Sequence, residues 1–223
     1  MKKRQNRSRM ELYVMAAAGM IGVALALLLC FSPQFRRQEV HKCATTNENW
    51  QSGPLTETQK AIQEFVPQEQ ELLQIAVWIN RQDDTAREGK LRLTVYDGEG
   101  VNQAVCERAV EELATNSWEW FDVNAKLTAG EIYYFSLETV GGGDICPTAV
   151  YRPMHLDRIE ENVRYFYDGG LIGDASAACQ YRYRLPLTIT EASIYVMFCL
   201  FFAFAAGELI CRAMRITGKK AGK

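Results

Sequence analysis

The amino-acid sequence predicts a mainly β protein, an antiparallel β-sandwich flanked by two transmembrane α-helices. Three observations support this prediction: a long apolar stretch near each end of the chain, period-two alternation of apolar and polar residues between them, and glycine-rich turns that separate the alternating segments. The expected order is a basic tail (1–11), a membrane span (12–31), a linker (32–60), the sandwich (61–188), a second span (189–211) and a second basic tail (212–223).

The first apolar stretch, residues 12–31, contains no charged residue. A helix of this length rises about 30 Å, which is the thickness of the hydrocarbon core of a bilayer. A cleaved signal peptide is the alternative, because basic residues precede the stretch. The apolar run exceeds the usual length of a signal core, and no small-x-small cleavage pattern follows it. A retained anchor is therefore favoured.

The second apolar stretch, residues 192–211, contains one charged residue, Glu208. Arg212 follows it at i,i+4 spacing, so the two side chains are expected to form an ion pair near the end of the span. The other interpretation is a functional carboxylate inside the membrane. The position of Glu208 close to the end of the stretch favours the ion pair.

Positive charges gather at both ends of the chain. The first 11 residues and the last 12 each contain five Lys or Arg, whereas residues 32–190 hold 15 Lys/Arg against 24 Asp/Glu, a net charge of −9. Because basic flanks stay in the cytoplasm, both termini are expected there, with the central domain outside the plasma membrane. The acidic centre argues against a nucleic-acid partner, since binding phosphates requires a positive face.

Small residues recur at four-residue spacing on both apolar stretches. Such stripes allow helix backbones to approach closely in lipid, and they predict packing of the helices on each other or on a partner membrane protein. The alternative is that alanine and glycine are simply common in membrane helices. The residues concerned are Ala18, Gly22, Ala26, Ala203 and Gly207.

Period-two alternation marks several strands in the centre of the chain. The inward positions are expected in residues 73–79, 91–95, 133–137 and 181–185. Turn formers lie between these segments, at 97–100, 128–130, 141–144 and 168–170. Short alternating strands with turns at such intervals are typical of a sandwich.

A series of core and turn residues carries a resemblance to a known type of domain. The series comprises Gln63-Glu64-Phe65, Leu72-x-x-Ile75-x-Val77, Gly89-x-Leu91-x-Leu93-x-Val95-Tyr96-Asp97 with Gly100, Trp118-x-x-Phe121, Gly130-x-x-Tyr133-x-Phe135-x-Leu137 and Tyr167-x-Gly169-Gly170. It resembles the jelly-roll, carbohydrate-binding-module-like extracytoplasmic domain of bacterial membrane proteins of cell-surface polysaccharide synthesis. Those proteins also have a multi-span catalytic or polymerase region, which has no counterpart in these 223 residues. The resemblance therefore implies glycan binding or assistance.

Four of the seven cysteines lie in the central region. In an oxidising compartment they predict two disulfides, with three possible pairings. Zinc binding is the alternative, but no C-x-x-C spacing exists. The candidates are Cys43, Cys106, Cys146 and Cys179.

No catalytic or metal-binding motif stands out, so the protein is expected not to be an enzyme and to have no cofactor. The two histidines, His41 and His155, lie in no recognisable motif. Neighbouring carboxylates are expected by chance among 27 acidic residues. Calcium could bind Asp97, Glu99 and Asp144 in glycine-rich turns, although Asp and Gly are also ordinary turn residues.

Aromatic residues supply the remaining functional signal. If the apolar positions of their strands face inward, then Trp78, Tyr96 and Tyr134 point outward, where they could stack on a sugar or bind a protein. Ordinary packing is the alternative. Trp118 and Trp120 share one side of their strand, but alternation does not tell whether that side is buried.

The sequence thus favours a non-catalytic glycan-binding or accessory module of the bacterial cell envelope, anchored in the lipid bilayer at both ends. The alternative is an interaction or assembly subunit of a larger membrane complex such as a transporter.

Overall fold

The computed structural model describes residues 2–42, 49–81, 88–141, 145–151, 164–173 and 175–220. The chain divides into two compact units. One is residues 38–185, and the other joins the two terminal segments, residues 1–37 and 186–223.

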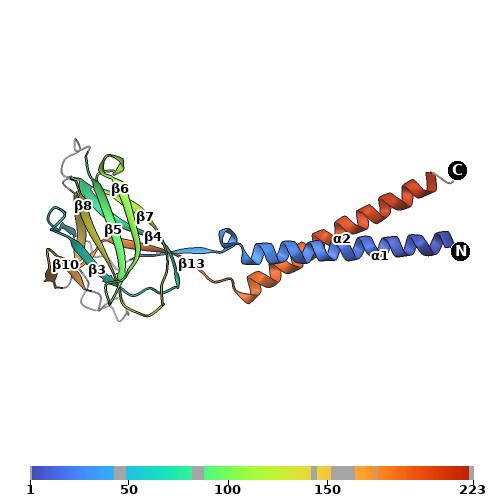
Figure 1. Ribbon diagram of the computed structural model, residues 1–223, viewed down its shortest axis with the longest axis horizontal. Helices are drawn as coiled ribbons and strands as arrows, with labels where there is room; N and C mark the ends of the chain where they lie inside the picture. The colour runs from blue at the N-terminus through green and yellow to red at the C-terminus, as the bar shows by residue number, and fades with distance from the viewer. Residues whose placement is uncertain are drawn as a thin grey trace. The chain divides into compact units, whose positions relative to one another are not determined.

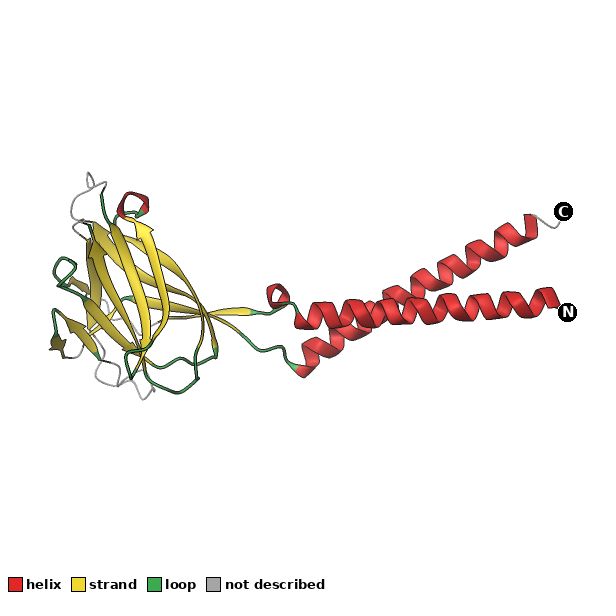
Figure 2. Cartoon of the chain, in the orientation of Figure 1, coloured by secondary structure: helices red, strands yellow, loops and turns green. Residues whose placement is uncertain are grey.

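In the described part of residues 38–185, two antiparallel sheets form a β-sandwich (Figures 1 and 2). One sheet, called here the β4 sheet, has the order β1-β13-β4-β9-β12, with β7 on the other edge of β4 and β2 beside β9. The β5 sheet has the order β11-β10-β3-β8-β5-β6. The strands are β1 (Gln38–Lys42), β2 (Asn49–Gln51), β3 (Ala61–Phe65), β4 (Glu71–Arg81), β5 (Lys90–Asp97), β6 (Asn102–Ala109), β7 (Ser117–Lys126), β8 (Tyr133–Val140), β9 (Ile145–Tyr151), β10 (Tyr165–Tyr167), β11 (Gly170–Ile172), β12 (Ala175–Ala177) and β13 (Cys179–Arg184).

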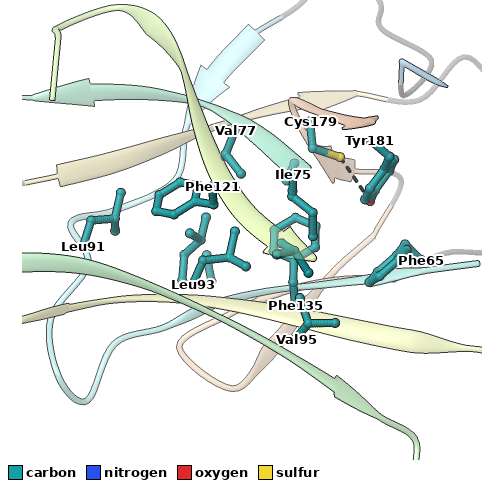
Figure 3. Close-up of a cluster of buried hydrophobic side chains, with 14 of the residues drawn as sticks. Phe65, Ile75, Val77, Leu91, Leu93, Val95, Phe121, Phe135, Cys179 and Tyr181 are labelled. Carbon is teal, nitrogen blue, oxygen red and sulfur yellow. Dashed lines mark hydrogen bonds between the residues drawn. The ribbon is translucent and has the colours of Figure 1, made fainter. Parts of the chain in front are cut away.

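The core lies between the two sheets and includes most of the alternating apolar residues that the sequence predicts (Figure 3). Successive side chains of a strand point to opposite faces, so one face of each sheet supplies the core. The fully buried members include Ile75, Val77 and Ile79 of β4, Leu91, Leu93 and Val95 of β5, Phe121 of β7, Phe135 and Leu137 of β8, and Tyr183 of β13. The mainly β sandwich fold is therefore confirmed.

A β-bulge near the start of β4 modifies the predicted alternation. The pairing of β4 with β7 shifts between Leu72 and Gln74, and both Leu72 and Leu73 are buried. An extra residue in one strand of an antiparallel pair bends the strand locally. Leu72 thereby joins the core, beside the regular positions that begin at Ile75.

Part of the segment expected to be a linker belongs to the sandwich. Strand β1 pairs with β13 over five residues, and the short β2 pairs with β9. Polar residues dominate both strands, which is why alternation did not predict them. The sandwich therefore begins about 20 residues before the predicted boundary, at Gln38.

The terminal segments form two helices, α1 (Lys2–Phe31) and α2 (Ile189–Lys220). Within them, residues Arg9–Phe31 and Ile189–Ile216 are long and apolar enough to cross a membrane. Helix α2 begins with a capping box, in which the Thr188 hydroxyl accepts from the Glu191 backbone N–H and the Glu191 carboxylate accepts from the Thr188 backbone N–H.

The two helices pack against each other in antiparallel directions (Figure 2). A Cβ on Gly22 would lie 2.8 Å from the Cβ of Ala203, and one on Gly207 would lie 3.0 Å from the Cβ of Ala18. Ala26 is also buried. The small-residue stripes thus lie between the two helices of this chain, where they allow close approach of the backbones.

Candidate ligand-binding face

Three tryptophans, Trp78, Trp118 and Trp120, lie on the outer face of the β4 sheet. Because Ile75, Val77 and Ile79 point into the core, the residues between them point away from it. The register with β7 places Trp118 opposite Trp78, and Trp120 opposite Ala76. Residues directly opposite each other in a sheet share a face, so the three tryptophans are neighbours.

The tryptophans are only partly buried. The rings of Trp78 and Trp118 meet edge to face, with their centroids 5.4 Å apart and their planes at 88°. Ala76, which lies opposite Trp120, has only a methyl side chain, so the indoles are the bulky groups on this part of the face. A partly exposed aromatic cluster of this kind can contact an apolar surface of a ligand.

A row of three polar side chains borders the tryptophans. Arg182 of β13 donates from Nη1 to Oε1 of Gln74 (2.5 Å), and Gln74 donates from Nε2 to Oδ1 of Asp122 (2.6 Å). The register places Gln74 between the other two, opposite both of them. These bonds fix the direction of the Gln74 amide and hold a cation, an amide and a carboxylate in line.

Arg182 also connects this polar row to the aromatic cluster. Its guanidinium carbon lies 4.2 Å from the centroid of the Trp120 ring, which is a cation–π contact. Arg182 thus covers part of the Trp120 ring, and the Trp78–Trp118 pair lies beside Trp120 on the same face. Indole rings flanked by planar hydrogen-bonding groups suit a ring-shaped polar ligand, which has apolar C–H surfaces and hydroxyl groups at its rim.

The three aromatic residues proposed from the sequence do not lie together. Trp78 belongs to the face just described, whereas Tyr96 of β5 and Tyr134 of β8 lie on the outer face of the β5 sheet. All three point away from the core, but the outward sides of two sheets in a sandwich are opposite surfaces of the molecule. A single platform of Trp78, Tyr96 and Tyr134 is therefore wrong.

Tyr96 and Tyr134 instead stack on each other, with centroids 5.5 Å apart and planes at 14°. Arg164 donates to the Tyr134 hydroxyl and makes two bonds to Oε2 of the buried Glu64 (2.8 and 2.6 Å). Burial, together with the hydrogen bond to the Glu64 carboxylate, raises the pKa of Tyr134, and burial also raises the pKa of Tyr96. Both residues are therefore neutral phenols at physiological pH, in a cluster whose charges are already matched.

Ion pairs cross the same outer face of the β5 sheet. Glu138 accepts from Lys60 and Arg92, and Glu107 accepts from Arg92 and Lys90. The hydrogen bonds from Lys90 and Arg92 lower the pKa of Glu107. Three cations and two carboxylates alternate along this row, so each carboxylate is engaged by two cations.

Trp118 and Trp120 are the site residues that sequence reasoning left undecided. The inward residues of that part of β7 are Glu119 and Phe121, and a buried acid breaks the apolar signal of an inward face. Arg108 donates to Glu119, which also accepts from the Ser117 hydroxyl (2.8 Å) and the Ala114 backbone N–H (2.9 Å). The sequence does not show which basic residue pairs with a buried acid, because Arg108 is one of many Lys and Arg residues in the chain.

The predicted disulfides are wrong for two of the four cysteines. Cys106 and Cys179 are both thiols and belong to different sheets, on β6 and β13. Cys106 donates to the Asp122 carbonyl, and Cys179 donates to the Tyr181 hydroxyl (Figure 3). Burial and the nearby Asp122 carboxylate raise the pKa of Cys106, which keeps the thiol protonated. The side chains of Cys43 and Cys146 lie outside the described residues.

The calcium interpretation finds no support at Asp97. Its Oδ1 accepts from the backbone N–H groups of Glu99 and Val101, and its Oδ2 accepts from Gln103. The carboxylate thus closes the β5–β6 turn, as Asp does in many turns. Asp144 lies outside the described residues. Within the described ranges, no group of three His, Cys, Asp or Glu side chains is arranged to hold a metal ion.

Comparisons with known proteins give distant likenesses. No protein-family model and no curated protein matches the chain. Among solved structures, a carbohydrate-binding module in complex with beta-1,4-galactotriose matches with a TM-score of 0.28 and 16% identity, covering 50% of this chain and 77% of that one. The cyanophage Pam1 capsid matches with a TM-score of 0.32 and 11% identity, covering 68% and 86%.

A Yersinia pseudotuberculosis-derived mitogen matches with a TM-score of 0.27 and 8% identity, covering 54% of this chain and 95% of that one. Likenesses with TM-scores this low carry no argument about function. The class of the protein rests on its own strand pairing: a two-sheet antiparallel β-sandwich with an apolar helix at each end.

Proposed function

We propose that this protein is a non-catalytic glycan-binding or accessory module of the bacterial cell envelope, anchored at both ends and exposed outside the cytoplasm. The observation that carries the proposal is the outer face of the β4 sheet, where Trp78 and Trp118 adjoin the row Arg182–Gln74–Asp122. Such a face offers stacking surfaces and directed hydrogen bonds to one ligand. The resemblance of the sequence to carbohydrate-binding-module-like domains supports the same ligand class.

The membrane anchoring is supported by the surface of the helix pair. Large apolar side chains stay exposed along both helices, for example Met20 (68%), Leu28 (62%) and Phe201 (69%). Such a surface is stable in lipid and costly in water. The packing of α1 on α2 favours retention of α1 as an anchor, since Gly22 and Ala18 contact α2.

The matched charges of the outer domain support a role without catalysis. The buried carboxylates of Glu64 and Glu119 are bound by Arg164 and Arg108, and Glu138 is bound by two cations. These three acids are therefore engaged in ion pairs within the domain.

A binding experiment on the full chain in detergent tests the proposal. A glycan array identifies ligands, and calorimetry then measures the affinity for the best one. We expect Trp78→Ala and Trp118→Ala each to weaken binding at least about tenfold, because aromatic side chains of this kind dominate binding energy.

Tyr96→Ala is the matched control, since it removes an aromatic side chain from the opposite face. It should leave the affinity within about twofold, a change too small for the loss of a direct contact. Absence of binding to every glycan on the array, or equal effects of all three substitutions, would contradict the proposal.

A membrane-complex subunit remains the second candidate. The observation in its favour is an apolar hollow of about 500 Å³ along the helix pair, lined by Gly19, Met20, Val23, Ala24 and Leu27 of α1 and by Leu200 and Phe204 of α2. Purification in mild detergent followed by mass spectrometry tests it. Recovery of one stoichiometric membrane protein would support this candidate, and recovery of the chain alone would count against it.

A further inference from the structure

A second hollow lies between α1 and α2 near the basic ends of the helices. Its volume is about 310 Å³. The lining residues are Arg9, Glu11, Leu12 and Met15 of α1 and Glu208, Cys211 and Arg215 of α2. Two arginines and two carboxylates thus surround a space that also has an apolar wall.

The carboxylates of this hollow are already bound. Glu11 accepts two bonds from Arg215, from Nε (2.9 Å) and from Nη2 (2.7 Å), in a bidentate pair that ties the two helices together. Glu208 accepts from Nε of Arg212 at 3.1 Å, the i,i+4 pair that the sequence predicts. Neither acid is therefore an unpaired negative charge that would repel an anion.

Cationic donors remain after these pairs have formed. Among the residues that the structure describes, no carboxylate lies within ion-pair distance of Arg9. Arg215 uses Nε and Nη2 for Glu11, so the N–H groups of its Nη1 are left for another acceptor. Two guanidinium groups thus line one hollow, an arrangement that suits phosphate oxygens.

The surroundings favour a lipid as the source of that phosphate. Leu12 and Met15 give the hollow an apolar side, and both belong to the apolar stretch of α1. Ten Lys and Arg residues crowd the two ends of the chain, a charge that attracts anionic headgroups. A lipid, whose phosphate adjoins its hydrocarbon chains, can contact the arginines and the apolar side of the hollow at the same time.

We propose that this hollow binds the phosphate of an anionic phospholipid headgroup at the cytoplasmic surface of the membrane. Arg9 and the Nη1 group of Arg215 donate to the phosphate, while Leu12 and Met15 contact the start of the acyl region. The inference rests on the membrane-spanning part of the proposed function and is independent of glycan binding.

The test uses the purified full chain in neutral detergent. Binding is titrated with three probes: short-chain phosphatidylglycerol, short-chain phosphatidylcholine and inorganic phosphate. We expect phosphatidylglycerol to bind most tightly, because it joins a net negative charge to an apolar tail. Equal affinity for phosphatidylcholine, or inorganic phosphate binding as tightly as phosphatidylglycerol, would overturn the lipid assignment.

Substitutions separate the hollow from the general charge of the tails. Arg9→Gln should weaken binding of phosphatidylglycerol about fivefold, while Arg9→Lys, which keeps the charge, should retain most of the affinity. Lys3→Gln is the matched control, because it removes one positive charge from the same basic tail. Equal losses for Arg9→Gln and Lys3→Gln would show diffuse attraction and overturn the proposed site.

Two further readouts keep the result interpretable. The helical circular dichroism of each variant shows whether the helix pair is intact. Arg9→Gln should leave it unchanged, because among the described residues the polar contact that joins α1 to α2 here is that of Glu11 with Arg215. Extraction of the chain from membranes by alkaline carbonate would mean that the anchoring part of the proposed function has failed. If the chain resists carbonate extraction but does not prefer phosphatidylglycerol over phosphatidylcholine, only the lipid-binding inference has failed.

Discussion

The carboxylate of Glu119 lies on the inner side of β7, where only 5% of the residue is exposed. A buried charge is costly unless it is paired and hydrogen-bonded. Arg108 supplies the opposite charge, and the Ser117 hydroxyl and the Ala114 N–H satisfy the second oxygen. These bonds tie the turn before β7 to β6 and so orient the start of the strand that carries Trp118 and Trp120.

Replacement of Glu119 by alanine tests this account. The change leaves Arg108 and two further donors without their acceptor, so it should lower the free energy of unfolding by about 2–4 kcal/mol. Urea unfolding followed by tryptophan fluorescence measures the loss. Glu111→Ala, an exposed acid a few residues earlier, is the control and should change stability by less than about 0.5 kcal/mol. Equal effects of the two substitutions would refute the structural role of Glu119.

At the level of elements, the helix pair depends on two close approaches. Gly22 lies against Ala203 and the carbonyl of Cys199, and Gly207 lies against Ala18 and Met15. The ion pair of Glu11 with Arg215 adds a polar contact nearer the basic ends. Glycine is required at position 22 because even a methyl group there would lie 2.8 Å from the Ala203 Cβ.

Gly22→Leu is therefore expected to separate the helices. Overpacking of this kind costs roughly 1–3 kcal/mol, and here it should lower the thermal stability of the helical circular dichroism signal in detergent. Gly19→Ala is the matched control, because its Cβ would lie 3.5 Å from the Phe204 ring, an ordinary contact. Equal melting temperatures of the Gly22→Leu and Gly19→Ala proteins would contradict this packing of the two helices.

For the whole molecule, we propose one arrangement across a membrane from the charge distribution and the two apolar helices. Both basic ends belong to the same helix pair, whose members run in opposite directions. An antiparallel pair that crosses a bilayer has its two outer ends on one side, and from the positive charges we expect that side to be the cytoplasm. The acidic sandwich is then expected on the other side.

Protease protection with an epitope tag at each terminus tests this topology. In spheroplasts, added protease should remove the sandwich while both tags stay protected, and after lysis both tags should be digested. Loss of the N-terminal tag from the mature protein would instead show that α1 is cleaved as a signal peptide. A tag that is digested in intact spheroplasts would contradict the orientation.

The sequence by itself determined the two apolar helices, the regularly alternating strands and most of the core positions on those strands. Alternation in residues 75–79 and 91–95 predicted the buried positions, because a strand with one face in a core must alternate. The uncharged stretch 12–31 predicted its helix, because length and hydropathy alone suffice there. The short polar strands β1 and β2 were missed because they carry no such pattern.

Only the tertiary structure decided which outward residues share a surface. Trp78 and Tyr96 read alike in the sequence, yet their strands belong to opposite sheets, and strand order depends on long-range pairing that local patterns do not encode. The same holds for Trp118, Trp120 and Arg182, which reach the face of Trp78 only through the pairing of β7 and β13 with β4. Alternation decides which way a side chain points, and sheet topology decides what it meets there.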